Sequence, residues 1–139
     1  MARFMGLDIG DKRIGVAFSD DSALIASPRE TRERRGNRKD ITYLLQLAQL
    51  ENVAEIVVGM PYSLDGSEGP QAATVRRFIH ALILCTKLSI TTWDERHTTV
   101  DAQEILLKTD ISRKKRKQSI DRVAAALILQ RFLDAQRSN

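Results

Sequence analysis

Near its start the chain reads Phe4-Met5-Gly6-Leu7-Asp8-Ile9-Gly10-Asp11-Lys12-Arg13-Ile14-Gly15-Val16-Ala17-Phe18-Ser19. Two apolar runs, Phe4 to Ile9 and Arg13 to Ser19, stand on either side of the turn residues Gly10-Asp11-Lys12. Runs of this kind, bounded by turn residues, are typical of strands joined in a hairpin. A third strand-like run follows at about Leu24 to Ser27. We therefore expect the chain to begin with a three-stranded antiparallel meander.

The rest of the chain alternates between helical and strand-like patterns. Apolar residues at helical spacing predict helices, and short runs of aliphatic residues predict buried strands. The expected elements are a helix from about Asp40 to Leu50 with Asn37 or Asp40 at its start, a strand from Ala54 to Met60, a helix that opens after the loop Tyr62 to Pro70, a strand from Ser89 to Trp93, a helix capped by Thr98 or Thr99, and a last helix capped by Ser119. The predicted order is β-β-β-α-β-α-β-α-α.

The alternation of strand and helix in the second half predicts an α/β fold. Strand, helix and strand in succession imply parallel strands with right-handed crossovers, so the first, fourth and fifth strands should point the same way. A length of 139 residues and a mass of 15.7 kDa suit one domain over residues 1–139. In such sheets the ligand site lies beyond the carboxyl ends of the parallel strands.

Acidic residues stand where this site is expected. Asp8 ends the first strand, Glu95 follows the fifth, and Asp121 opens the last helix. Oxygen ligands of this kind hold hard divalent cations, and such ions promote phosphodiester hydrolysis. With one strand between them, Asp8 and Glu95 should start about 10 Å apart, which suits the longer glutamate side chain. Asp94 faces away from Glu95 on a strand and is expected to position it. The alternative is that these acids are solvated turn and helix-end residues.

Positive charge is concentrated in two runs. The net charge is +4, yet Arg29 to Lys39 and Arg113 to Lys117 together carry +9, which leaves −5 for the rest of the chain. Basic surfaces beside an acidic site favour a polyanion such as nucleic acid. Aromatic residues make up only 5% of the chain, which argues against a single-strand binder built on stacking. The alternative is that both runs are solvated loops, and we place Arg113 to Lys117 in the connection between the last two helices.

The cysteine content and the hydropathy pattern bear on the compartment. The single cysteine, Cys85, follows the apolar stretch Phe78 to Leu84, so we expect a buried, unreactive thiol and a reducing compartment. The first residues lead directly into a strand, with neither a signal segment nor a run of about 18 apolar residues. These features predict a soluble cytoplasmic protein with no membrane partner.

Four motifs resemble those of the YqgF family, also called RuvX-like, of the RNase H-like superfamily. They are Gly6 to Ala17, Val58-Gly59-Met60-Pro61 with Asp65-Gly66, Asp94-Glu95-Arg96-His97-Thr98-Thr99, and Lys117 with Asp121 to Gln130. The motifs occur in the family's order and cover essentially the whole chain. Members of this family are named as pre-16S rRNA nucleases or as Holliday junction resolvases.

The resemblance implies a fold and a catalytic centre. The fold is RNase H-like, a five-stranded mixed sheet in the order 3-2-1-4-5 flanked by helices. The centre is a Mg²⁺ or Mn²⁺ site whose acidic residues fall by position on Asp8, Glu95 and Asp121. RuvC-type resolvases, a more distant likeness, use four acids. Here the fourth strand ends without one, and Asp65 in the following loop is the spare carboxylate.

Basic residues near the acids are the expected phosphate contacts. They are Lys12, Arg13, Arg96, Arg113, Lys114, Lys115, Arg116 and Lys117. Gly10 and Gly15 are expected to let a nucleic-acid backbone come close.

The resemblance also implies a role in processing the 5′ end of the 16S ribosomal RNA precursor, by hydrolysis of phosphodiester bonds. The protein should then act as a monomer or weak dimer. Cleavage of four-way DNA is the alternative, and it would favour a dimer because symmetric cuts need two sites. A non-catalytic RNA-binding module is a second alternative. An actin-like ATPase is a third, although those proteins need two such domains and this chain has one.

Overall fold

A computed structural model of the chain describes residues 2–95 and 113–137. In chain order the elements are β1 (Arg3–Ile9), β2 (Arg13–Ser19), β3 (Ala26–Glu33), α1 (Asn37–Leu50), β4 (Val53–Met60), α2 (Pro70–Ile83), β5 (Ser89–Asp94) and α4 (Arg113–Arg137). The strands form one sheet in the order β3-β2-β1-β4-β5, which confirms the predicted topology.

β1 lies at the centre of the sheet. It pairs antiparallel with β2 and parallel with β4, and β4 pairs parallel with β5. The carboxyl ends of β1, β4 and β5 therefore meet at one edge of the sheet, as the strand and helix alternation predicts. Met5 and Leu7 on β1 are fully buried, as expected for a strand covered on both faces.

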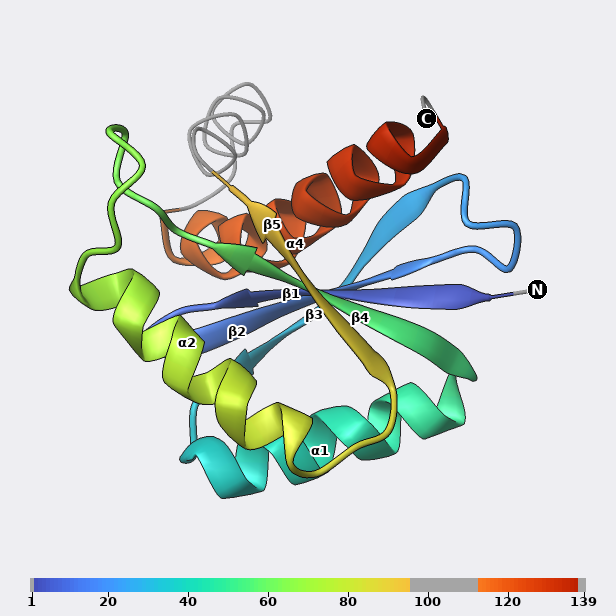
Figure 1. Cartoon of the computed structure of the whole chain (residues 1–139), viewed down its shortest axis with the longest axis horizontal. Coiled ribbons are helices and arrows are strands. Elements are labelled where there is room, and N and C mark those ends of the chain that lie inside the picture. Colours follow the sequence, from blue (N-terminus) through green and yellow to red (C-terminus); the bar gives the residue numbers. More distant parts are fainter. Residues whose placement is uncertain (1, 96–112, 138–139) are drawn as a thin grey trace.

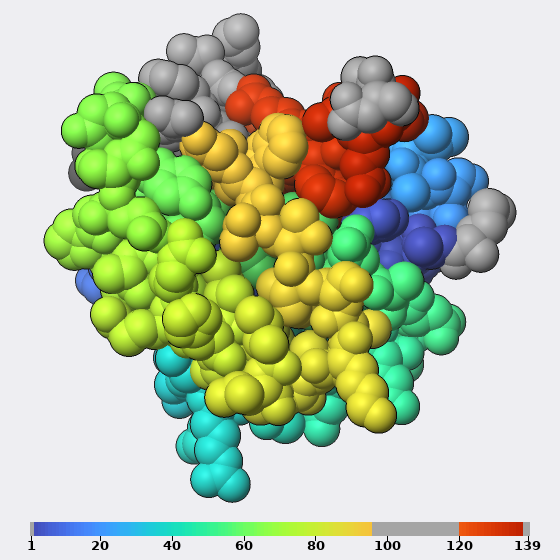
Figure 2. All heavy atoms as spheres, in the orientation of Figure 1, coloured from blue at the N-terminus to red at the C-terminus, as the bar shows by residue number. Residues whose placement is uncertain are grey.

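Helices cover both faces of the sheet. Figure 1 shows α1 and α2 on one face and α4 across the other. Leu44 of α1 and Phe78 of α2 pack with Leu7 in one buried cluster, while Leu129 of α4 packs with Ala17 in a second. Each large aliphatic side chain buried in this way contributes about 1.5–3 kcal/mol. Figure 2 shows β5, at the edge of the sheet, on the surface between α2 and α4.

The third strand differs from its predicted position. It runs from Ala26 to Glu33 and not from Leu24 to Ser27. The carboxylate of Asp20 accepts hydrogen bonds from the backbone N–H groups of Leu24 and Ile25, which holds both in the preceding turn. The strand then continues into the basic run, because an edge strand with one solvated side tolerates charged residues.

Two helix starts also differ from expectation. α1 begins at Asn37 after Gly36, and Asp40 is not its cap but a buried residue within the first turn. α4 begins at Arg113 and not at Ser119, so the basic run belongs to the helix and is not a linker. Lysine and arginine are good helix formers, which explains why the helix extends through them. The helix expected after Thr98 lies outside the described residues.

Cys85 is exposed, so the prediction of a buried thiol was wrong. The apolar stretch before it is amphipathic: Phe78, Ile79 and Leu82 face the core, while Leu84 is largely exposed. Cys85 lies just beyond the end of α2, outside the part of the pattern that faces the core. Within residues 2–95 and 113–137, no helix is long and apolar enough to span a membrane.

Candidate active site

Asp8 lies between two glycines in a row across the sheet. It pairs directly with Gly15 on β2. On the other side, Gly59 of β4 follows Val58, which pairs with Leu7, so Gly59 stands next to Asp8. Glycines on both sides leave the space above the sheet open to residues that arrive from elsewhere in the chain.

The space above Gly15 is taken by the backbone of α4. A Cβ atom at Gly15 would lie 1.8 Å from the main-chain oxygen of Asp121. Only glycine therefore lets α4 come close enough to carry Asp121 to the neighbourhood of Asp8. We expected Gly15 to admit a nucleic-acid backbone, but the backbone that approaches it is the protein's own. Gly10 has a similar local role, since its Cβ would lie 2.8 Å from the main-chain oxygen of Arg13.

The space above Gly59 is taken by the side chain of Glu95. A Cβ atom at Gly59 would lie 2.1 Å from Glu95 Oε2. Glu95 follows β5, where its backbone N–H donates a hydrogen bond of 3.2 Å to the main-chain oxygen of Met60. The glutamate therefore extends over β4 toward β1, as expected from its length. Glu95 Oε2 is buried and has no hydrogen-bond partner within the described part of the chain.

Burial raises the pKa of all three acids. Burial raises the pKa of Asp8 well above its ordinary value, and the charges of Glu95 and Asp121 raise it further. Burial, together with the charge of Asp94, raises the pKa of Glu95 to about 7. Burial also raises the pKa of Asp121, although Arg13 partly offsets this. A cation placed among these groups would relieve both the desolvation and the repulsion.

Arg13 holds the carboxylate of Asp121. Its Nε donates a hydrogen bond of 2.9 Å to Asp121 Oδ2, and both side chains are partly exposed. No group of three histidine, cysteine, aspartate or glutamate side chains among the described residues is arranged to hold a metal ion. Because Asp121 Oδ2 is bound to Arg13, this oxygen would have to exchange Arg13 for a cation in order to act as a ligand. Asp8 and the unpartnered oxygen of Glu95 fit a hard cation as they stand.

The remaining predicted residues fall into different settings. Lys12 is exposed in the turn between β1 and β2. Asp65 Oδ1 accepts hydrogen bonds from the backbone N–H and the hydroxyl of Ser67, so this carboxylate is held within its own loop. Trp93 packs edge-on against Phe132 in a structural contact. Arg113, Lys114, Lys115, Arg116 and Lys117 form the start of α4, whereas Arg96 and His97 lie outside the described residues.

Sequence reasoning missed Arg34, which fastens the turn that carries Arg13. Arg34 Nη1 donates to the main-chain oxygen of Gly10 at 2.9 Å, and its backbone N–H donates to the oxygen of Lys12 at 2.8 Å. Its Nε donates to Asp40, which is fully buried. The only sequence signal for this link was an aspartate at a position of α1 that faces the core.

Comparison with known proteins gives closely similar sequences. The family model described as "RuvX: Holliday junction resolvase" matches residues 2–135. A protein of Thermoanaerobacter pseudethanolicus named "Putative pre-16S rRNA nuclease" is 48% identical over 98% of this chain and 99% of its own length. A protein of the same name from Syntrophomonas wolfei is 44% identical over 95% of this chain and 94% of its own length.

Comparison with solved structures identifies the fold as that of RuvC-like, RNase H-type resolvases. RuvC of T. thermophilus in complex with a Holliday junction substrate gives a TM-score of 0.64 at 12% identity, covering 100% of this chain and 98% of that one. The Holliday junction resolvase of fowlpox virus gives a TM-score of 0.56 at 9% identity, covering 96% and 99%. These two likenesses concern the fold alone. The family match and the sequence identities both extend over nearly all of the chain, which therefore belongs to the RuvX family.

Proposed function

We propose that this protein is a metal-dependent nuclease that hydrolyses phosphodiester bonds at the 5′ end of the 16S rRNA precursor. The observation that carries the proposal is the side chain of Glu95 over Gly59, next to Asp8, with its Oε2 buried and unpartnered within the described residues. The backbone of Asp121 lies against Gly15 on the other side of Asp8, and the charges of Glu95 and Asp121 both raise the pKa of Asp8. Acids buried together at such a cost are a frequent sign of a functional site. A structural role would be expected to leave no buried oxygen without a partner.

Mg²⁺ or Mn²⁺ is the proposed cofactor. Asp8 and Glu95 offer the oxygen ligands that these ions prefer, and Asp121 would complete the set. When bound, such an ion supplies Lewis-acid stabilisation of charge on the phosphoryl oxygens. Burial and neighbouring acids raise the pKa of Asp8, and that of Glu95 to about 7, so a bound cation would favour the ionised form of both groups.

Basic residues around the acids are proposed to bind the phosphates of the substrate. Lys12 is exposed beside the site, and Arg13 becomes available as Asp121 turns to a cation. Arginine forms bidentate hydrogen bonds to phosphate, which positions a strand without reading its sequence. Arg96 and the run from Arg113 to Lys117 remain predicted phosphate contacts.

RNA is the favoured substrate because the relatives of about 40–48% identity carry the name of a pre-16S rRNA nuclease. The resolvases share only the fold. One set of carboxylates suffices to cut one strand, whereas paired cuts in a junction require two sites related by symmetry. We accordingly propose a single catalytic domain that acts as a monomer or weak dimer in the cytoplasm.

The test offers the purified protein end-labelled precursor 16S rRNA and labelled four-way DNA in parallel, with Mg²⁺, with Mn²⁺ and with EDTA. The matched variants are Asp8→Asn and Asp65→Asn, since Asp65 is a nearby loop carboxylate engaged with Ser67. We expect metal-dependent cleavage of the RNA, lost in Asp8→Asn and kept in Asp65→Asn. Paired cuts in the DNA with intact RNA would establish a resolvase instead. Tight binding of RNA with no cleavage under any metal condition would establish an RNA-binding module.

A further inference from the structure

The basic run Arg29 to Lys39 divides into cations that pair with carboxylates of the fold and cations that extend outward without such a pair in the described part of the chain. Arg32 and Arg34 donate to the two carboxylate oxygens of Asp40, at 3.1 and 2.7 Å. Arg29 lies 3.5 Å from the carboxylate of Glu51. Three of the six cations in the run are therefore paired with carboxylates: Arg32 and Arg34 are largely buried, whereas Arg29 is exposed.

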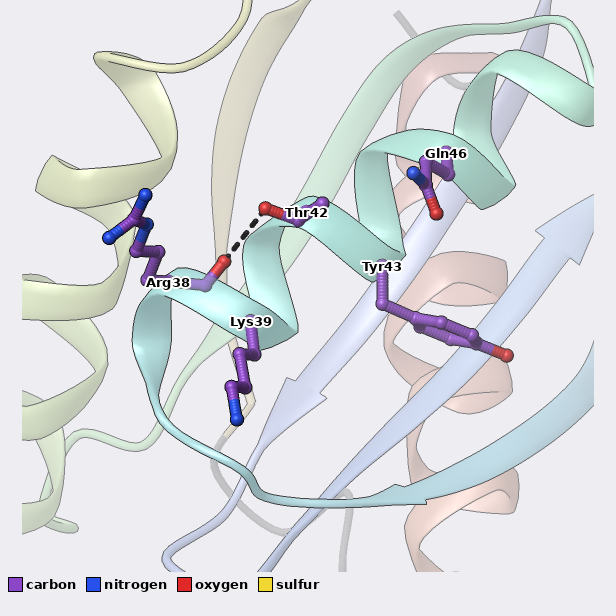
Figure 3. A pocket seen from close by; sticks show the side chains of 5 residues that line it. All are labelled: Arg38, Lys39, Thr42, Tyr43 and Gln46. Atoms are coloured by element: carbon purple, nitrogen blue, oxygen red, sulfur yellow. Dashed lines mark hydrogen bonds between the residues drawn. The ribbon is translucent and has the colours of Figure 1, made fainter.

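The outward part consists of Arg35, Arg38 and Lys39. All three are exposed, and no carboxylate within residues 2–95 pairs with their side chains. Figure 3 shows Arg38 and Lys39 extending away from the first turn of α1. Together with Thr42, Tyr43 and Gln46 they line a shallow hollow of about 340 Å³. Unpaired cations around a surface hollow are suited to bind an anion.

This surface is joined to the active site by hydrogen bonds. The backbone of Arg34, directly before Arg35, donates to the oxygen of Lys12, directly before Arg13. A second hollow, of about 380 Å³, lies at this junction and is lined by Asp11, Lys12, Arg13, Glu33 and Arg34. The basic side chains therefore form a series. It begins with Arg13 and Lys12 at the turn between β1 and β2 and continues through Arg35 to Arg38 and Lys39 on α1.

We propose that Lys12, Arg35, Arg38 and Lys39 form a track that binds the phosphates of a single nucleic-acid strand where it leaves the active site. The proposal rests on the proposed nuclease function and adds the path of the substrate. Asp11 and Glu33 border the track near the turn, so attraction is expected to be strongest at Arg38 and Lys39 on α1. Contacts there are to the backbone of the strand, because the ring of Tyr43 is already covered by Arg32 at 4.3 Å.

The experiment compares two variants that each remove two exposed positive charges. The test variant is Arg38→Gln with Lys39→Gln, and the control is Arg77→Gln with Lys87→Gln, on and just after α2. Binding is measured by fluorescence anisotropy in EDTA, so that cleavage is not required. The probes are RNA and DNA strands of about 4 and about 20 nucleotides, since a short strand occupies the active site without reaching α1.

We expect the test variant to bind the long strands several-fold more weakly than wild type, and the short strands equally well. The slope of log affinity against log salt should become shallower by about 1.4 for the long strands, because each phosphate contact contributes about 0.7 in single strands. RNA and DNA should be affected alike, since the contacts are to phosphate.

An unchanged salt slope, or an equal change in the control variant, would overturn the track. A loss restricted to RNA would also overturn it, since that would indicate recognition of the ribose or the bases. The proposed nuclease function is tested separately: absence of cleavage by wild type refutes that function, while the binding comparison still decides whether the track exists.

Discussion

Glu95 Oε2 lies 2.1 Å from the point that a Cβ atom of Gly59 would occupy. The glycine thus provides the space that the glutamate fills, although the glycine lies on β4 and the glutamate follows β5, far away in the sequence. A Cβ at this position would also lie 2.6 Å from Ile128 Cδ1 of α4, so both the site and the packing of the helix depend on its absence.

Gly59→Ala should therefore impair activity far more than a typical surface substitution. The added methyl displaces Glu95 or α4, and overpacking of this kind costs about 1–3 kcal/mol of stability. A displacement of about 1 Å at a catalytic group lowers activity on the order of 100-fold. Gly69→Ala is the control, since its Cβ meets only Ser63 Oγ at 3.7 Å. Wild-type cleavage by Gly59→Ala, measured on the labelled RNA, would contradict the assignment of Glu95 to the site.

Glu95→Gln should change how stability depends on pH. Folding raises the pKa of Glu95 from 4.5 to about 7, so the native state binds this proton more tightly than the unfolded state. The stabilising contribution is complete below pH 4.5 and is lost as the pH rises through about 7. The difference between the two pKa values corresponds to about 3 kcal/mol of stability, at about 1.4 kcal/mol per pKa unit.

This change is measured by urea unfolding of the metal-free proteins at about pH 4 and pH 8. From about pH 4 to pH 8 the free energy of unfolding of wild type should fall by about 3 kcal/mol more than that of the glutamine variant. An equal change in the free energy of unfolding with pH in the two proteins would show that Glu95 is not desolvated in the native state. Addition of Mg²⁺ at pH 8 should stabilise wild type and have a weaker effect on the variant.

Arg13→Gln should raise the pKa of Asp121. Burial already raises this pKa, and the ion pair with Arg13 lowers it in part, so loss of the pair leaves the effect of burial alone. The measurement is the carboxyl carbon chemical shift of Asp121 against pH in the metal-free protein. Lys12→Gln is the control, because Lys12 is the adjacent exposed cation in the same turn. An Asp121 pKa that is unmoved in Arg13→Gln would show that the ion pair does not form in solution.

Asp40→Asn should be strongly destabilising. Burial raises the pKa of Asp40, but hydrogen bonds from Arg34, the backbone of Arg35 and Arg32 outweigh it and leave the pKa lowered. Removing one partner of a buried ion pair costs about 3–5 kcal/mol. The control is Asp21→Asn, which removes a largely exposed partner of Arg3 and should cost at most about 1 kcal/mol. Equal unfolding free energies for the two variants would refute a buried Asp40.

Comparing Arg34→Lys with Arg32→Lys distinguishes the contact that holds the turn between β1 and β2 from the contacts that hold Asp40 of α1. Both remove a hydrogen bond to Asp40, but only Arg34 also binds the oxygen of Gly10. We expect similar losses of stability, with a fall in kcat for cleavage in Arg34→Lys alone, since that turn carries Arg13. Equal kcat values would show that the turn holds its position without Arg34.

The sequence predicted the topology well because the strands of this fold carry clear patterns. β1, β2 and β4 are buried runs bounded by turn residues, and the two parallel pairings follow from the helices between them. The predicted position of the edge strand β3 was wrong because its mostly polar residues show no alternation of apolar and polar side chains. Only its pairing with β2, a contact between distant residues, defines it.

The sequence indicated the acidic residues of the candidate site but not the arginines that form ion pairs around it. Asp8 and Glu95 were predicted from their places at the ends of parallel strands, and Asp121 from an expected helix start, whereas the structure places Asp121 inside α4, which begins at Arg113. The ion pair of Arg13 with Asp121 joins residues 108 positions apart, and no local pattern indicates it. The basic run from Arg29 was interpreted as uniformly outward, since burial of Asp40, which draws Arg32 and Arg34 inward, depends on tertiary packing.

The approach of α4 to Gly15 also determines how closely Asp121 can be kept in place. The main-chain oxygen of Asp121 rests on the backbone of β2, with no side chain in between. Side chains in a helix and sheet interface change rotamers and let a helix drift, whereas a backbone that touches a backbone has no such freedom. The positional fluctuation of Asp121 should consequently be that of the central sheet itself. Its carboxylate can then exchange one partner for another while its Cα stays still.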